Sequence, residues 1–314
     1  MKRSVTVIGA GVVGLSIAHE LAGAGHAVTV CSDQPWEQTC SATAGAIWFP
    51  FEVDGGADTE VMLRSTLERF ESIHDQHVDA GVDFRRGTVV ERSTVVDREW
   101  TRVVPGWKET TLVPPGTTGV RATVPVITMS VYLPWLRAAT EARGVRFESR
   151  TIHSVDEAEV ADELVVIAAG LRSTRLIDDE SPVDPVRGQV VRIDNTGPDS
   201  VQEWLLDEHN PAGLTYVIPR RDCLVLGGTA EAGETDLTPD AAVERGIIDR
   251  CADYFPQIRG REVVSRGVGL RPRRPVIRID ATTVDGRRVI SAYGHGGAGV
   301  TLSWGTAEQV LTLV

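Results

Sequence analysis

The chain has 314 residues, of which 42% are hydrophobic and 24% charged, a composition typical of a folded globular protein. Its formal net charge of -12 disfavours non-specific binding to nucleic acid or to an anionic membrane, so the expected partner is a small molecule. The four cysteines and the scattered histidines lack metal-ligand spacing, and four cysteines are too few for a disulfide scaffold. We expect no metal site and a reduced interior.

Residues 4–33 predict a strand, a tight turn, a helix and a second strand, and the turn carries Gly9-x-Gly11-x-x-Gly14. In a dinucleotide-binding fold, the first glycine allows the turn and the second brings bare backbone to the pyrophosphate. The third lets the helix pack closely on the strand. Asp33 follows the second strand at the interval expected for a ribose-binding carboxylate. The segment therefore predicts a bound dinucleotide, with a glycine-rich packing turn as the alternative. Polar residues interrupt its apolar runs, which predicts neither a signal peptide nor a membrane anchor.

The chain then departs from the regular strand-helix alternation expected of a plain nicotinamide enzyme. A loop rich in small residues and aromatics precedes a helix predicted from about Glu60 to Asp79. The Pro/Gly-rich residues 113–125 predict a surface crossover, and the next buried-type strand is "ELVVIAAG" at 163–170. A return to the first sheet after so long an insertion indicates two interleaved domains.

The end of the chain repeats the strand, glycine turn and helix pattern. A strand is predicted from Arg288 to Ala292, followed by a glycine-rich turn and a helix that begins near Val300. The N–H groups at that helix start can face a polarised or negatively charged oxygen, such as the carbonyl of a flavin ring.

Seven sequence blocks are spread along almost the whole chain. They are "VIGAGVVGLS" at 7–16, "TAGAIWFP" at 43–50, "VIAAG" at 166–170, "RGQ" at 187–189, "TYVIP" at 215–219, "GLRPRRPVIR" at 269–278 and "AYGHGGAGVTLSWG" at 292–305. Together these blocks resemble the D-amino acid oxidase family of FAD enzymes, which is related to D-aspartate and glycine oxidases. The resemblance implies an α/β fold in which a Rossmann-type FAD-binding domain is interleaved with a mixed α+β substrate-binding domain.

The implied domain boundaries follow from where these blocks fall. The FAD-binding domain is assigned residues 1–52, 128–183 and 280–314, and the substrate-binding domain residues 53–127 and 184–279. The resemblance also implies contacts to FAD, which we place at Gly9, Ala10, Gly11, Val12, Val13, Gly14, Asp33, Ser41, Gly45, Ala46, Ile47, Gly170, Gly296, Gly297, Gly299, Val300 and Thr301.

Five residues carry over to the family's catalytic and substrate-binding positions. Arg271 would grip the substrate carboxylate, because a planar guanidinium forms two parallel charge-assisted bonds to it. Tyr216 would add a hydroxyl, and the carbonyl of Gly297 would hold the amine. Phe49 and Ile218 would form an apolar slot for neutral side chains.

The neighbouring polar residues receive structural roles. Arg273, Arg274 and Arg278 are assigned to the surface or to ion pairs, and His295 to a packed turn rather than to a catalytic base. The "DEHNPAGLTY" segment lacks the second tyrosine of the animal members and is shorter, which puts a lid function in doubt. Ala230 stands where D-aspartate oxidases are expected to carry an arginine, so acidic substrates are disfavoured.

The implied activity is oxidative deamination of a D-amino acid, with hydride transfer to flavin N5 and release of a 2-oxo acid, ammonia and hydrogen peroxide. The implied partners are the D-amino acid and O2, a cytoplasmic location is the default, and a homodimer stays open. The alternatives are a D-aspartate oxidase or a glycine- or sarcosine-type flavin amine oxidase. From other classes they are a non-catalytic dinucleotide-binding module or an NAD-dependent dehydrogenase.

Overall fold

The computed structural model describes residues 2–53, 57–92, 97–155, 164–177, 179, 181–284 and 286–314. Its helices are α1 (Val12–Gly23), α2 (Cys40–Thr43), α3 (Ala57–Gln76), α4 (Met129–Glu141), α5 (Ala241–Tyr254) and α6 (Gly299–Thr312). Its strands are β1 (Ser4–Ile8), β2 (Ala27–Ser32), β3 (Val82–Glu91), β4 (Lys108–Thr110), β5 (Thr118–Ile127), β6 (Arg146–Ser149), β7 (Leu164–Ile167), β8 (Asp184–Ile193), β9 (Trp204–Asp207), β10 (Thr215–Pro219), β11 (Leu224–Gly227), β12 (Glu231–Ala232), β13 (Val263–Val284) and β14 (Arg287–His295).

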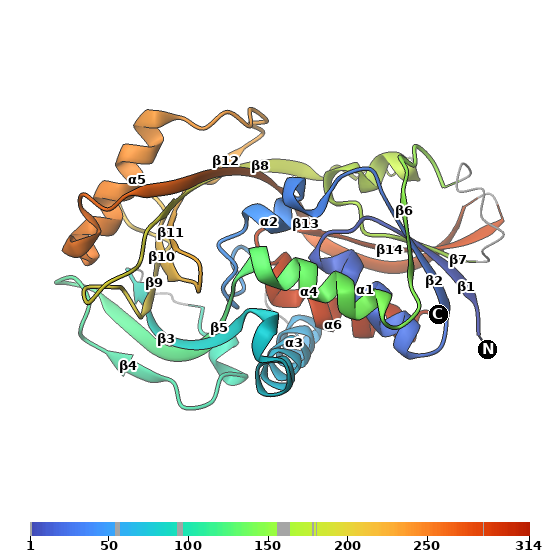
Figure 1. The fold of residues 1–314 in the computed structure, drawn as a ribbon, viewed down its shortest axis with the longest axis horizontal. Coiled ribbons are helices and arrows are strands. Elements are labelled where there is room, and N and C mark those ends of the chain that lie inside the picture. Colours follow the sequence, from blue (N-terminus) through green and yellow to red (C-terminus); the bar gives the residue numbers. More distant parts are fainter. Residues whose placement is uncertain are drawn as a thin grey trace.

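One half of the molecule is a parallel sheet in the order β14-β7-β1-β2-β6. Every residue of β7 is buried, as expected for a strand covered on both faces. The expected strand began one residue earlier, but Glu163 lies outside the described residues. Helices α1, α3, α4 and α6 lie together below this sheet (Figure 1). The prediction of a Rossmann-type α/β fold is confirmed by this arrangement.

The other half contains β3, β5, β9, β10, β11 and β8, which are mostly antiparallel to their neighbours. Helix α5 packs on β8, β10 and β11. Its buried Ile247, Cys251 and Ala252 meet Leu224 and Leu226 in a separate apolar cluster. This half therefore has a core of its own, away from the parallel sheet.

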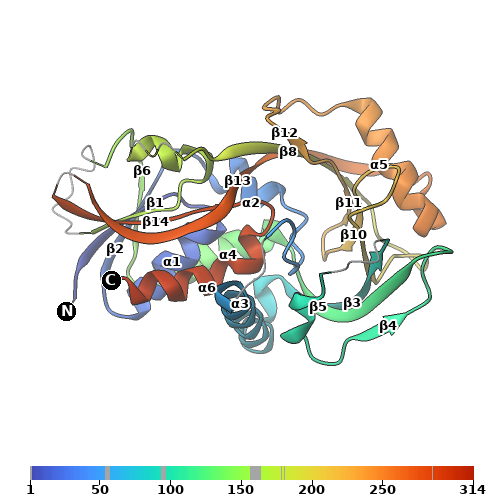
Figure 2. The same ribbon diagram turned by 180° about the vertical axis from the view of Figure 1, so that it is seen from behind.

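The long strand β13 joins the halves, as the views from both sides make clear (Figures 1 and 2). Strand β13 pairs with β8 through residues 263–273 and with β14 through residues 273–284. The boundary drawn at 279–280 therefore falls within one continuous strand. The division into two interleaved domains stays a prediction.

Two expectations about local structure differ from what the fold contains. Residues 118–127 are not a surface crossover but strand β5, which pairs with β3 over its whole length. Val120, Ala122 and Val124 alternate into the core, and the flanking prolines and glycines obscured that period-two pattern. Helix α3 begins and ends three residues earlier than expected, and a short 3-10 turn at Val78–Ala80 follows it.

Candidate active site

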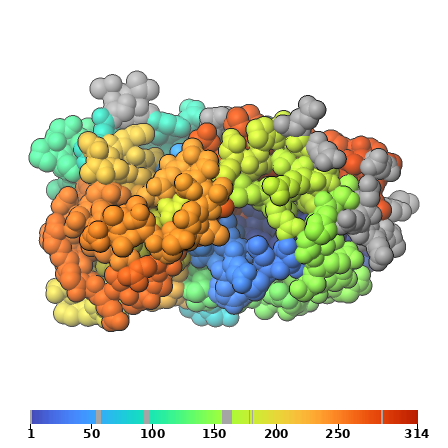
Figure 3. Space-filling model, turned by 90° about the horizontal axis from the view of Figure 1, so that it is seen from above, coloured from blue at the N-terminus to red at the C-terminus, as the bar shows by residue number. Residues whose placement is uncertain are grey.

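A cavity of about 480 Å³ runs between the two halves of the molecule. Its walls come from the turn after β1, the end of β2, the 38–51 loop, β8, β9, β10, β13 and the turn between β14 and α6. In Figure 3 the surface is hollowed between the blue segment that holds Gln38–Cys40 and the yellow-green segment that follows β7, both of which line the cavity. Every residue expected at the FAD or substrate site lines this cavity except Gly14 and Thr301.

The first glycine turn is built so that bare backbone faces the cavity. Gly9 has a φ of 113°, and a Cβ atom on it would lie 2.4 Å from the carbonyl oxygen of Ala168. A Cβ atom on Gly14 would lie 2.0 Å from the carbonyl oxygen of Gly9. Gly14 therefore serves the close packing of α1 on the turn, which is the role given to the third glycine.

Helix α1 points its N-terminus at this end of the cavity. Gly11 occupies the N-cap position and supplies no side-chain acceptor to the first turn. The N–H of Val12 donates to the hydroxyl of Ser41 over 3.0 Å, which ties the 38–51 loop to the helix start. The N-terminal partial charge of α1 therefore faces the cavity, where a pyrophosphate is expected.

Asp33 lines the same end of the cavity, at the end of β2. Its Oδ2 pairs with Arg172 and accepts a bond from the hydroxyl of Thr151 over 3.4 Å. Both contacts use one carboxylate oxygen, so Oδ1 stays available for ribose hydroxyls. Arg172, which the sequence did not single out, holds this carboxylate in place.

The second glycine turn lies at the other end, between β14 and α6. Gly296 has a φ of 53°, and its N–H donates over 2.8 Å to the carbonyl of Pro272, the residue after Arg271. A Cβ atom on Gly297 would lie 2.5 Å from the ring of Phe51. The turn is thus fixed beside Arg271, and a side chain at position 297 would require the Phe51 ring to move.

Thr301 does not line the cavity, although the preceding residue, Val300, does. Its hydroxyl donates to the carbonyl of Phe49 over 2.8 Å and accepts from the N–H of the same residue over 3.2 Å. Its side chain therefore anchors the segment that carries Phe49. A direct contact from this hydroxyl to a flavin ring would compete with those bonds.

Arg271 projects from β13 across β8. A Cβ atom on Gly188 would lie 2.5 Å from its Nη2, so the missing side chain at Gly188 makes room for the guanidinium. Nη1 donates to the carbonyl of Thr229 over 2.9 Å, and the guanidinium carbon lies 5.6 Å from the Phe51 ring centre. These contacts hold the guanidinium in the cavity with donors left for a ligand.

The ring of Tyr216 lies against bare backbone in the same wall. Cβ atoms on Gly227 and Gly228 would lie 2.0 and 2.8 Å from its atoms. Burial raises the pKa of Tyr216, and the nearby Arg271 guanidinium opposes that shift. The phenol therefore stays protonated at neutral pH and can donate a hydrogen bond next to Arg271.

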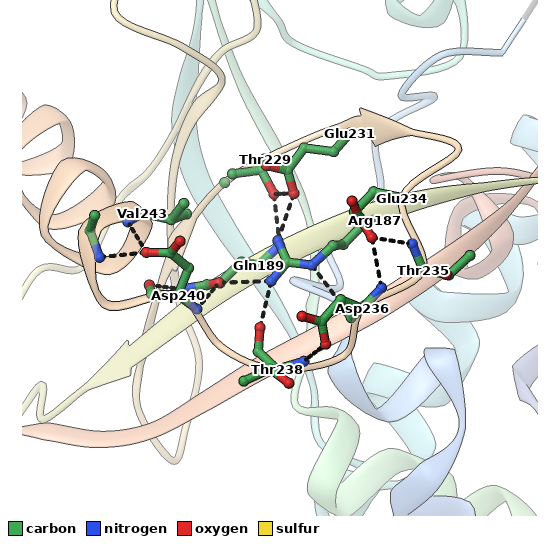
Figure 4. Close-up of polar contacts among 12 residues, drawn as sticks. Arg187, Gln189, Thr229, Glu231, Glu234, Thr235, Asp236, Thr238, Asp240 and Val243 are labelled. Carbon is green, nitrogen blue, oxygen red and sulfur yellow. Dashed lines mark hydrogen bonds and ion pairs between the residues drawn. The ribbon is translucent and has the colours of Figure 1, made fainter.

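A polar network surrounds Arg187 and Gln189 of β8 (Figure 4). Arg187 donates to the carbonyl of Asp236 over 2.6 Å and to that of Thr238 over 2.7 Å. The side chain of Gln189 donates to the carbonyl of Asp240 and accepts from its N–H, each over 2.8 Å. The N–H of Gln189 also donates to the hydroxyl of Thr229 over 3.0 Å, so β8 fixes the residue whose carbonyl holds Arg271.

The wall beside Tyr216 is mainly apolar. Phe49 packs edge-on against Trp100 with ring centres 5.4 Å apart, and Ile218 is 2% exposed. Leu206 and Leu214 complete this wall, and one carboxyl, that of Glu208, lines it too. No sequence motif marked Glu208.

The remaining predicted polar roles are confirmed by the contacts. Arg274 and Arg278 pair with Asp179 over 3.6 and 2.7 Å, while Arg273 is exposed. His295 forms a hydrogen bond through Nε2 with the hydroxyl of Thr306 over 2.9 Å. Burial lowers the pKa of His295 to about 4, so the ring is neutral at neutral pH.

The described residues contain no His, Cys, Asp and Glu group arranged to hold a metal ion, and all four cysteines are free. A search of the same residues for a helix with the length and apolar character of a membrane span finds none.

Comparison with known proteins places this chain in a family. The family model described as "FAD dependent oxidoreductase" matches residues 4–313. A D-amino-acid oxidase of Rubrobacter xylanophilus is 38% identical, covering 98% of this chain and 94% of that one. A D-amino-acid oxidase of Streptomyces coelicolor is 36% identical over 98% and 96% of the two chains. A human D-aspartate oxidase is 32% identical over 99% and 94%.

Among solved structures, glycine oxidase from Geobacillus kaustophilus superposes with a TM-score of 0.81 at 19% identity, covering 99% of this chain and 94% of that one. At that identity the likeness establishes the fold alone. The two glycine turns facing one cavity fit FAD, whose pyrophosphate and flavin need bare backbone at opposite ends. The chain is an FAD-dependent oxidoreductase that belongs to the D-amino acid oxidase family.

Proposed function

We propose that this chain catalyses the oxidative deamination of D-amino acids with neutral or apolar side chains. The products are a 2-oxo acid, ammonia and hydrogen peroxide. The observation that carries the proposal is the position of Arg271, which lies beside Tyr216 and next to the Gly296–Gly297 turn in a single cavity. The D configuration rests on the names of the two bacterial relatives.

In this proposal Arg271 and Tyr216 bind the substrate carboxylate, and the carbonyl of Gly297 accepts a hydrogen bond from the neutral amine. Three anchors around one carbon fix which hydrogen faces the cofactor, so positioning supplies much of the rate. The turns at Gly9–Val13 and Gly296–Gly297 would hold FAD, which would supply a hydride acceptor for the α-hydrogen and a route for the electrons to O2. His295 is neutral and hydrogen-bonded to Thr306, in keeping with a reaction that needs no side-chain base.

The side-chain preference follows from the wall beside Tyr216. Phe49, Ile218 and Leu206 offer an apolar surface, and burial of each methylene there contributes about 0.8 kcal/mol. Arg220 and Arg221 follow the cavity-lining Ile218 closely in sequence but are engaged elsewhere, because Arg220 pairs with Asp222 over 3.0 Å and Arg221 with Asp83 over 2.8 Å. We therefore propose that D-aspartate is a poor substrate.

The 208–214 segment, for which a lid function is in doubt, is internally bonded. The side chain of Asn210 accepts from the N–H of Ala212 over 3.0 Å and donates to Thr215 over 3.1 Å. Product release without large loop movement, a cytoplasmic location and a homodimer remain proposals.

The functional test is a peroxide-coupled screen of neutral, basic and acidic D-amino acids against their L enantiomers. Oxidation of any one of D-alanine, D-methionine and D-norleucine supports the proposal. Turnover restricted to glycine, sarcosine, D-aspartate or L substrates contradicts it.

A further inference from the structure

Two arginines, Arg192 on β8 and Arg220 after β10, lie behind the loop that forms one wall of the cavity. Arg192 follows the cavity-lining Val190 by two residues, and Arg220 follows the cavity-lining Ile218 by two. Alternation along a strand therefore directs both arginines to the cavity face of the sheet. Neither arginine lines the cavity itself, and both contact the loop whose residues 43–47 do line it.

Both guanidinium groups bind backbone carbonyls of this loop. Nη2 of Arg192 donates to the carbonyl of Thr43 over 3.1 Å and to that of Ala42 over 3.4 Å. Nη1 of Arg220 donates to the carbonyl of Ala44 over 3.4 Å. In a trans peptide the N–H points opposite to the C=O. These bonds therefore turn the N–H groups that follow each carbonyl away from the arginines and towards the cavity.

The next part of the loop presents backbone donors to the cavity. In the described part of the chain, the N–H groups of Gly45, Ala46 and Ile47 have no hydrogen-bond acceptor, and all three residues line the cavity. Ala46 has a φ of 60°, and its carbonyl accepts from the N–H of Ile127 over 2.8 Å. A residue other than glycine keeps such a φ only where its surroundings hold it. The arginines hold the loop before Ala46, and β5 holds it at Ala46.

The two arginines carry more positive charge than the carboxylates around them neutralise. Arg220 is 5% exposed and pairs with Asp222 over 3.0 Å. Burial opposes the ionisation of Asp222, but hydrogen bonds from Arg220 hold its pKa at about 2, so Asp222 cancels one charge. Burial raises the pKa of Cys223 to about 12, so this thiol adds no negative charge.

Arg192 keeps the charge that is left over. Among the described residues no carboxylate forms an ion pair with it, and its Nε is buried without a hydrogen-bond partner. Burial and the nearby Arg220 lower the pKa of Arg192, but a guanidinium stays protonated at neutral pH. One uncompensated positive charge therefore lies behind the loop.

We propose that Arg192 is a positioning residue for FAD, which holds the 42–47 loop together with Arg220 and supplies a positive charge that favours reduction of the flavin. Reduction adds negative charge to a flavin ring, and a fixed cation nearby stabilises that charge. Residues 45–47, whose N–H groups are open to the cavity, are among those assigned to FAD. The inference concerns the cofactor and does not depend on which amino acid the enzyme oxidises.

The test measures the reduction potential of the FAD-loaded enzyme and its affinity for sulfite, which adds to oxidised flavin and leaves the ring negatively charged. Arg192→Gln keeps a donor for the Thr43 carbonyl and removes the charge. We expect sulfite to bind this variant about tenfold more weakly, as for the loss of one charge at an effective dielectric constant near 20. Its reduction potential should fall by about 30 mV, which is tenfold in a two-electron equilibrium.

A second variant reverses the sign of the expected change. Asp222→Asn removes the negative charge that cancels Arg220, and its remaining oxygen can still accept a bond from that guanidinium. Sulfite should bind this variant several-fold more tightly than the wild type, and the reduction potential should rise. A purely structural role for this cluster would not produce tighter binding.

Arg261→Gln is the matched control. Arg261 also donates to backbone carbonyls, those of the 194–199 segment, but it does not line the cavity or contact the 42–47 loop. It should leave both measured values unchanged. Wild-type sulfite affinity in Arg192→Gln, or weaker sulfite binding in Asp222→Asn, would overturn the inference. If Arg192→Gln does not retain FAD, the direction of the change in Asp222→Asn decides.

The two measurements also separate this inference from the proposed function. Neither sulfite binding nor the reduction potential requires an amino acid substrate. If no D-amino acid is oxidised, the proposed function fails and the comparison of Arg192→Gln with Asp222→Asn still decides the role of Arg192. If D-amino acids are oxidised and both variants keep the wild-type potential and sulfite affinity, the inference alone is overturned.

Discussion

Replacing Gly227 with alanine should damage substrate binding through Tyr216. The added Cβ atom would lie 2.0 Å from Cζ of Tyr216, whereas ordinary contacts begin near 3.4 Å. Strand β11 is held between β10 and β8, so the ring must move by about 1.4 Å, the difference between those two distances. Overpacking of this kind costs about 1–3 kcal/mol of folding free energy, and a displacement near 1 Å at a reacting centre costs about 100-fold in rate.

The assay pairs urea unfolding with steady-state kinetics on a neutral D-amino acid. The matched control is Gly246→Ala in α5, where the new Cβ atom would meet only the tip of Arg250 at 3.2 Å. An alanine within a helix stabilises by about 0.5–1 kcal/mol relative to glycine, so the control should be as stable as the wild type or more so. Wild-type kcat/KM in a well-folded Gly227→Ala variant would refute the placement of Tyr216 in the substrate site.

Three further predictions follow from contacts around the cavity. In Gln189→Leu, Asp240 and Arg187 lose their bonds to Gln189, so the free energy of unfolding in urea should fall by about 2–3 kcal/mol. The variant should also raise KM more than it lowers kcat. Unaltered stability and KM would contradict this prediction. Asp33→Ala should weaken FAD binding roughly tenfold or more, measured by fluorescence titration, while KM at saturating FAD stays constant. Burial lowers the pKa of His295 from 6.5 to about 4, so the unfolded chain binds a proton at a higher pH than the folded chain does. The free energy of unfolding therefore falls as the pH drops through this range, by about 3 kcal/mol in total. In His295→Gln, unfolding at pH 7 and pH 4.5 should differ less than in the wild type, and an equal difference would count against this assignment.

The elements that sequence patterns predicted correctly are those with local signals. The turn at Gly9 and the helix after Gly297 are marked by glycines that their own backbone conformation or close packing requires. Strand β7 is a run of four buried apolar residues. Strand β5 was missed because its alternation runs through glycine and proline, which are common in loops.

The support of Arg271 could not be predicted from local sequence. Gly188 and Thr229 lie far from Arg271 in the chain and meet it only because β8 pairs with β13 and the 229–240 segment folds back over β8. Glu208 was missed for a related reason. It lies in the turn that follows β9 and lines the cavity, whereas an acidic residue after a short strand is usually exposed.

The most direct test of the account is anaerobic mixing of the Arg271→Ala variant with a neutral D-amino acid. Since Arg271 is assigned to the substrate and not to FAD, we expect the purified variant to carry FAD with an ordinary flavin spectrum. The wild-type flavin should bleach within the mixing experiment, and the variant flavin should bleach at least a hundredfold more slowly at the same substrate concentration, as expected from losing about two charge-assisted bonds. Bleaching of the variant at the wild-type rate would contradict the claim that Arg271 holds the substrate.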